Sequence, residues 1–222
     1  DLPYEDLRFA KVDLHRSLRA ALSSRIAISG LMPLWQLMIR DSVDADTPRL
    51  AAKLRVLNYC FDEALFAGLP APKPVSRTEP VKFLFLGLVI PRKGIHLILE
   101  ALSRIPREQA ELTIVGANGI PPSVFGRYAD RVTYIPTVAR SDVPRIMSEH
   151  HAFLLPSYFE GAGITLYEAL ASGCALIQSR HCAEAVTPQT GIMLDAIDTD
   201  HVHAAMMKVI EDLQMQSRQI GR

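Results

Sequence analysis

Short apolar runs alternate with segments of helical spacing through most of residues 80–215. A continuous apolar run that ends at a glycine, such as 81–86 before Gly87, is typical of a parallel strand buried on both faces. The alternation predicts an α/β fold with a doubly wound parallel sheet. Strands are predicted at 81–86, 111–115, 131–135, 152–155, 175–178 and 191–194, and helices at 94–103, at 141–149, after 163 and at 200–215.

This pattern also predicts where a ligand would bind. In doubly wound sheets, ligands lie beyond the carboxyl ends of the strands, so the loops that follow the first five predicted strands form the candidate binding rim. Ser141 is expected to cap the helix that runs through Glu149, because serine side chains accept hydrogen bonds from free N–H groups at helix starts.

The first 80 residues have a different pattern. Residues 71–80 hold three prolines without periodicity and are predicted to be an interdomain linker. Before them, helices are predicted at 4–22 and 34–41 and strands at 25–29 and 54–58, which is a poor core for a domain on its own. The predicted organisation is therefore a partial domain at 1–70, the linker at 71–80 and a complete domain at 81–215.

Composition narrows the class of protein. Of 222 residues, 49% are hydrophobic and the formal net charge is zero, which argues against disorder and gives no electrostatic support for nucleic-acid binding. The odd number of cysteines, without metal-binding spacing, favours a reducing compartment. A mean hydropathy of +0.13 also suits association with a membrane surface. The expected location is the cytoplasm, with the inner face of the membrane as an alternative.

The segment 156–173 carries the clearest chemical signal. Glu160 precedes a predicted helix that begins near Gly163, and Glu168 lies within that helix. Glycine allows a ligand to approach the backbone, and a helix start offers free N–H groups to a phosphate. Two carboxylates that bind hydroxyls, on either side of a phosphate site, match the chemistry of a sugar nucleotide.

The same segment resembles the Glu-x7-Glu motif of retaining glycosyltransferases of the family 4 kind, which are glycosyl transferases of group 1 with a GT-B fold. It departs from the family's usual run at Ala162, Tyr167 and Leu170, and none of these changes removes a polar group. The resemblance implies that 81–215 is the Rossmann-like, C-terminal domain that binds the donor. It also implies that 1–70 is the last part of the N-terminal Rossmann-like domain, whose larger part lies outside this sequence.

Roles for the motif residues follow from the resemblance. Glu160 is expected to lie at the donor sugar, and Glu168 is expected to bind both ribose hydroxyls. The alternatives are an ordinary loop carboxylate and an ordinary glutamate on a helix surface. The backbone around the helix start is expected to bind the diphosphate; its residues are Gly161, Ala162, Gly163, Ile164 and Thr165.

A second resemblance lies in 87–94, between the first predicted strand and helix. It is similar to the family's Gly-Arg-x-x-x-x-Lys-Gly, whose two cations neutralise the donor diphosphate. Lys93 matches the lysine, but Leu88 stands in place of the arginine, and Arg92 is the candidate for the second charge. A leaving diphosphate needs such charges because negative charge accumulates on it as the glycosidic bond breaks. A solvated lysine in a turn is the alternative for Lys93.

Further contacts are implied with less specific residues. Gly87 begins this second motif and is also expected to contact the donor. Gly116 begins the run 116–119, which the resemblance places at the floor of the nucleotide pocket, although a tight turn is at least as likely for Asn118 and Gly119. Thr137 and Val138 correspond to positions where relatives contact the base through backbone groups. The loop 183–186 resembles the one that touches the donor sugar, with His181 and Cys182 in place of two glycines.

The resemblance implies a hexosyltransferase that takes its sugar from a nucleotide diphosphate and passes it to a glycan or lipid acceptor, with no metal and no cofactor. The adjacent His150 and His151 do not change the expectation of no metal, because neighbouring helix residues do not face one another. A non-catalytic module of the same fold, which binds a nucleotide sugar or a partner protein, is the main alternative. A sugar-nucleotide epimerase is a third.

Overall fold

A computed structural model of the protein describes residues 62–70, 79–160, 163–183 and 185–220. The chain divides into two compact units, Asp1–Tyr59 and Cys60–Arg222, and the described residues all belong to the second. The helices and strands predicted within 4–58 and most of the predicted linker lie outside the described residues.

The second unit is built on a six-stranded sheet in the order β3-β2-β1-β4-β5-β6, with every neighbouring pair parallel. This is the strand order of a Rossmann-like, doubly wound fold, which confirms the predicted α/β class. Each predicted strand is present, with bounds that differ by no more than a residue. The bounds are β1 Val81–Leu86, β2 Ala110–Val115, β3 Val132–Ile135, β4 Ala152–Leu155, β5 Ala175–Ser179 and β6 Gly191–Leu194.

The central strands carry the core. Every residue of β4 is buried, and in β1 the aromatic rings of Phe83 and Phe85 are fully buried with Leu84 between them. Side chains alternate between the two faces of a strand, so burial of consecutive residues means that both faces are covered. The apolar runs in the sequence are thus explained by position in the middle of the sheet.

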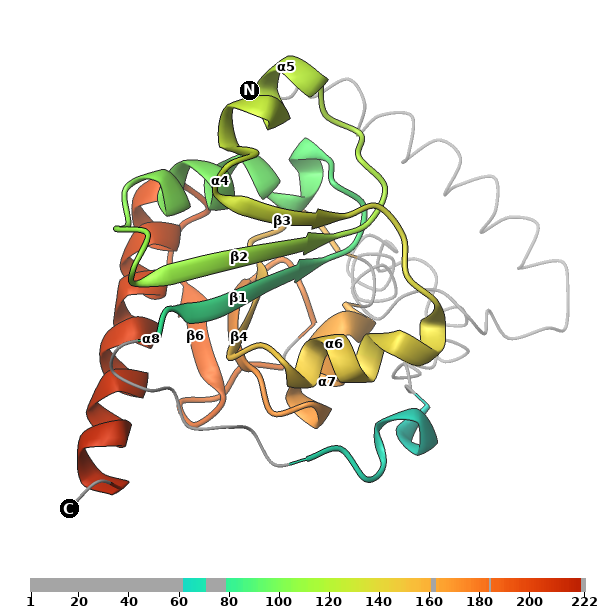
Figure 1. Ribbon diagram of the computed structural model, residues 1–222, viewed down its shortest axis with the longest axis vertical. Helices are drawn as coiled ribbons and strands as arrows, with labels where there is room; N and C mark the ends of the chain where they lie inside the picture. Colours follow the sequence, from blue (N-terminus) through green and yellow to red (C-terminus); the bar gives the residue numbers. More distant parts are fainter. Residues whose placement is uncertain (1–61, 71–78, 161–162, 184, 221–222) are drawn as a thin grey trace, which may run out of the picture. The chain divides into compact units, whose positions relative to one another are not determined.

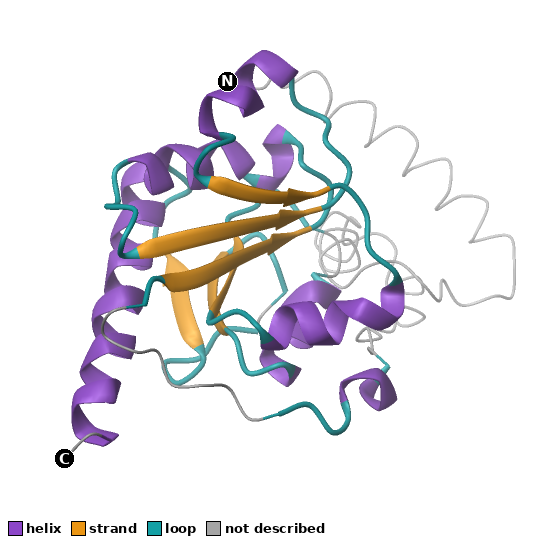
Figure 2. Ribbon diagram, in the orientation of Figure 1, coloured by secondary structure: helices purple, strands orange, loops and turns teal. Residues whose placement is uncertain are grey.

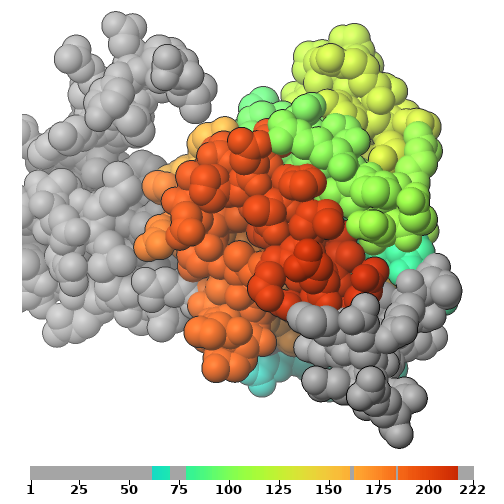
Figure 3. All heavy atoms as spheres, turned by 90° about the vertical axis from the view of Figure 1, so that its left-hand side faces the viewer, coloured from blue at the N-terminus to red at the C-terminus, as the bar shows by residue number. Residues whose placement is uncertain are grey.

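The helices cover the sheet in two groups on opposite faces (Figures 1 and 2). On one face α4 (Ile95–Ser103) packs against α8 (Thr199–Ile220), and Figure 3 shows the residues of α8 lying beside those of α4. On the other, α6 (Val143–Ser148) packs against α7 (Ile164–Ala171), while α5 (Pro122–Phe125) lies between β2 and β3 in the chain. In the part of the chain that the structure describes, no helix has the length and apolar character needed to cross a membrane.

The start of α6 differs from the prediction. Ser141 lies within a short 3₁₀ turn, Arg140–Asp142, and the helix itself begins at Val143 without a side-chain cap. The reason is Pro144, which occupies the first turn of the helix. Proline has its backbone φ already fixed at a helical value and needs no hydrogen-bond acceptor there, so it favours a helix start beside it rather than three residues earlier. The expectation that Ser141 caps the helix was wrong.

The boundary between the units also falls earlier than the predicted linker. A 3₁₀ helix, η1 (Glu63–Phe66), belongs to the second unit and contacts α7. Phe66 is only 7% exposed and joins the core cluster of that unit, which ties the segment to it. The chain therefore enters the second unit at about residue 60, before the proline-rich stretch.

Candidate functional site

The candidate site lies where the order of strands reverses, between β1 and β4. The loop after β1 and the loop after β4 meet there. The N–H of Tyr158 donates to the carbonyl oxygen of Arg92 at 2.9 Å. Gly94 has a positive φ of +71°, and a Cβ on it would lie 2.2 Å from the carbonyl oxygen of Pro156. Only glycine permits this approach, which brings the Lys-Gly pair against the start of the motif segment.

An ion pair joins the two loops. Lys93 Nζ lies 2.9 Å from Glu160 Oε1, and both side chains are largely buried, at 13% and 10% exposure. The Ser157 hydroxyl donates to the same oxygen at 2.9 Å. Arg92 lies 3.5 Å from that oxygen and also donates to the carbonyl oxygen of Phe159. Two cations therefore surround one carboxylate, which leaves a net positive charge at the strand ends.

Hydrogen bonds from the end of β5 and the loop after it hold the segment that carries Glu160. The N–H of Glu160 donates to His181 O at 3.0 Å, and the Ser179 hydroxyl donates to Ser157 O at 2.5 Å. The buried amide of Gln178 donates to Ala183 O at 2.6 Å. The bonds of Glu160 and Ser179 tie the motif segment to the end of β5 and to His181, and the bond of Gln178 holds Ala183, where the loop expected near the donor sugar begins.

Glu168, the second carboxylate of the motif, lies within α7. Gly163 is the N-cap of α7 and has a left-handed φ of +57°, which turns the chain into the helix. Glu168 is 3% exposed and forms an ion pair with Arg140, which lies on the loop after β3. The hydrogen bond to Glu168 raises the pKa of the Arg140 guanidinium above its ordinary value, so this group stays charged.

The other predicted residues are distributed around the same edge of the sheet. Ile164 and Thr165 form the half-buried first turn of α7, where backbone N–H groups have no partner within the helix. Thr137 is exposed and Val138 half-buried on the loop after β3. Gly161 and Ala162 lie outside the described residues, so their expected phosphate contacts remain predictions.

Gly87 and Gly116 meet at the ends of β1 and β2. A Cβ on Gly116 would lie 1.9 Å from Gly87 O, and a Cβ on Gly87 would contact the end of the Lys93 side chain. The two loops continue side by side, since Val89 N donates to Ala117 O at 2.9 Å. The glycines thus bring the backbone close to Lys93.

Some residues with reactive side chains lie away from the carboxyl ends of the strands or are buried in packing contacts. Within the described ranges, no cluster of three or more His, Cys, Asp or Glu residues could hold a metal ion. His151 accepts a hydrogen bond from Lys82 N, at the opposite end of β1. Cys182 is buried, and burial raises the pKa of its thiol, so it is a packing residue.

Sequence reasoning missed two residues of the site. Ser157 was visible as part of the motif, but its bond to Glu160 depends on the turn between them. Arg140 is 28 positions from Glu168, and no local pattern joins them. The available signal was its place two residues after Val138, on a loop already assigned to the binding rim.

Comparison with known proteins agrees with this architecture. The family model of glycosyl transferases group 1 matches residues 80–212. An O-antigen chain mannosyltransferase B from Escherichia coli is 27% identical over 58% of this chain and 36% of its own length. A phosphatidyl-myo-inositol mannosyltransferase from Mycolicibacterium smegmatis is 26% identical over 93% of this chain and 53% of its own. The chain thus spans about half or less of these relatives.

Solved structures show the same fold. HepE from Anabaena, in complex with UDP and glucose, superposes with a TM-score of 0.62 at 19% identity, over 74% of this chain and 49% of its own. The likeness confirms the Rossmann-like architecture of GT-B glycosyltransferases. From the matched family and the six-stranded fold together, the chain belongs to the glycosyl transferases of group 1.

Proposed function

We propose that residues 81–215 bind a nucleoside-diphosphate sugar and serve as the donor half of a retaining hexosyltransferase of the family 4 kind. The donor would lie across the carboxyl ends of β1 and β4. Glu160 would face the sugar and Glu168 the ribose, with the diphosphate between them at the start of α7. The acceptor, a glycan or a lipid, would be held by residues outside this domain.

The observation that carries the proposal is the contact of Lys93 with Glu160. An ammonium group has three N–H donors, and one of them goes to Glu160 at 2.9 Å. Within the described ranges no other acceptor takes the remaining donors, so they can reach phosphate oxygens while the carboxylate stays in place. Arg92 adds a second cation within 3.5 Å of the same carboxylate. Charge at this place would stabilise the leaving diphosphate as the glycosidic bond breaks, so no metal ion is required by the proposal.

The motif itself spans the places proposed for the sugar and for the ribose. The distance along the motif from Glu160 to Glu168 covers the turn at Gly163 and the first turn of α7. The relatives named above are sugar transferases, and HepE was solved with UDP and glucose, which is consistent with a nucleotide sugar as ligand. Transfer itself would also need the acceptor to be held close, because proximity provides much of the rate.

A second candidate is a module of the same fold that binds the nucleotide sugar without transferring it. Leu88 favours this candidate. It is 53% exposed and stands at the position where the family motif has an arginine, so one of the motif's two cations is missing. Transfer assays separate the two functions. The catalytic function predicts hexose release to water or acceptor that depends on Glu160, whereas the binding module predicts tight binding and no turnover.

The role of Lys93 is tested by replacing it with methionine. Lys93→Met should weaken the binding of a nucleoside diphosphate by about 1.5–3 kcal/mol, the usual contribution of a hydrogen bond to a charged group. The affinity for the corresponding nucleoside should change little, because the nucleoside has no phosphate. Isothermal titration with UDP, GDP and ADP and with uridine, guanosine and adenosine measures both.

Lys82→Met is the matched control, because Lys82 is an exposed lysine near the start of β1, whereas Lys93 lies in the loop beyond the end of that strand. It should bind as the unaltered protein does. Equal losses for nucleoside and diphosphate in Lys93→Met, or no loss for either, would contradict the phosphate role.

A further inference from the structure

Arg140 is the feature of the site that the motif does not explain. Its guanidinium pairs with Oε1 of Glu168, a carboxylate that is 3% exposed, while Arg140 itself is half exposed. A buried carboxylate without a partner is costly, so this arginine stabilises Glu168 where it stands. Among the described residues, no hydrogen bond reaches the other oxygen, Oε2.

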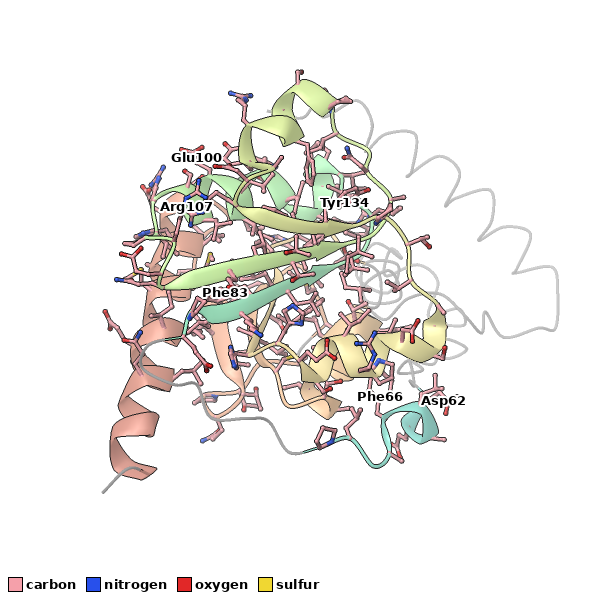
Figure 4. The ribbon with its side chains drawn as sticks, viewed as in Figure 1. Asp62, Phe66, Phe83, Glu100, Arg107 and Tyr134 are labelled. Carbon is pink, nitrogen blue, oxygen red and sulfur yellow. The ribbon has the colours of Figure 1, made fainter. Side chains whose placement is uncertain are left out.

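A second contact holds Arg140 itself. Its guanidinium carbon lies 5.9 Å from the centre of the Phe66 ring, a cation–π distance. Phe66 is fixed in the core, and Asp62 on the same segment adds to the rise in the pKa of Arg140. Figure 4 shows Phe66 on η1 and Asp62 at its start, where it is the N-cap; η1 contacts α7. Arg140 is therefore positioned from the segment where the chain enters this unit.

We infer that Arg140 is a positioning residue that orients the Glu168 carboxylate for the ribose of the donor. This inference rests on the proposed function, in which Glu168 binds the ribose. Arg140 donates a hydrogen bond to Oε1 of Glu168. Because the carboxylate is planar, this bond also sets the direction of Oε2, so the carboxylate has one orientation rather than several. An acceptor with a fixed orientation binds adjacent hydroxyls better, because less conformational entropy is lost when they bind.

The inference predicts an effect that depends on the ribose hydroxyls. Unaltered protein should bind the best of UDP, GDP and ADP about tenfold or more tightly than its 2′,3′-dideoxy counterpart. Arg140→Gln should reduce this ratio to within about threefold, mainly by weakening the ribonucleotide. A loss of structure alone would weaken both ligands alike and leave the ratio unchanged. Arg140→Lys, which keeps the charge but not the planar fork, should give an intermediate ratio.

Arg145→Gln is the matched control, because Arg145 is also a partly exposed arginine in an ion pair, with Glu149, on α6. Its ratio should equal that of the unaltered protein. An unchanged ratio in Arg140→Gln overturns the inference, and so does tighter ribonucleotide binding, which would make Arg140 a competitor of the ribose. If the unaltered protein binds nucleotides without discriminating the hydroxyls, the ribose role of Glu168 fails. If it binds none, the proposed function fails as well.

Discussion

At the scale of single residues, close backbone contacts decide which positions must be glycine. Gly116 has a φ of +140° and no room for a Cβ, because that atom would lie 1.9 Å from Gly87 O. The ends of β1 and β2 depend on this contact, and Lys93 lies against Gly87. The same glycine therefore affects both the stability of the sheet and the backbone beside the candidate phosphate site.

Gly116→Ala should lower the free energy of unfolding by about 1–3 kcal/mol or more, because the new methyl group forces the backbone apart at a φ that other residues rarely adopt. Gly126→Ala is the control: Gly126 has a helical φ of −59° and open space around its Cβ position. That substitution should leave stability unchanged or raise it by about 0.4–1 kcal/mol. Urea denaturation of both variants measures the difference; equal stabilities would contradict the steric argument.

At the scale of elements, His151 connects the end of α6 to the sheet. Its Nδ1 accepts a hydrogen bond from Lys82 N at 2.9 Å, so the ring must be neutral at that nitrogen. Burial, and then the positive charge of Lys82, lower the pKa of His151 below the ordinary 6.5. Burial also lowers the pKa of its neighbour His150. Protonation of either ring therefore destabilises the folded state.

Stability should fall as the pH drops below about 6.5. As the pH falls, His150 and His151 are protonated in the unfolded chain at a higher pH than in the folded chain, because their pKa values are lowered by folding. Stability is therefore lost from about the unfolded pKa down to the folded pKa of each histidine. The loss amounts to about 1.4 kcal/mol for each unit by which a pKa is lowered. Urea denaturation between pH 5 and pH 8 measures the slope. His151→Gln, which keeps an acceptor but does not titrate, should reduce it, and an unaltered slope would contradict this assignment.

At the scale of the whole molecule, the described unit is a six-stranded parallel sheet whose core was predictable from the sequence, with the candidate site at the carboxyl ends of its strands. The strands were predictable because both faces of β1 and β4 are buried and leave continuous apolar runs. The start of α6 was mispredicted because Pro144 outweighed Ser141. The two motifs predicted that Lys93 and Glu160 lie at the carboxyl ends of strands, but not that they form an ion pair. The pairing of Arg140 with Glu168 also depends on tertiary structure and has no local pattern.

The donor site is tested most directly by a calorimetric titration of the 222-residue chain with UDP, GDP, ADP and their hexose conjugates, repeated with Glu168→Ala. We expect one base to be bound best and Glu168→Ala to weaken this binding by about 1–3 kcal/mol, because the ribose hydroxyls lose their acceptor. Glu149→Ala, which removes the exposed glutamate that follows α6, should bind as the unaltered chain does. Binding of none of these ligands, or binding that Glu168→Ala leaves unchanged, would contradict the assignment of this edge to the donor.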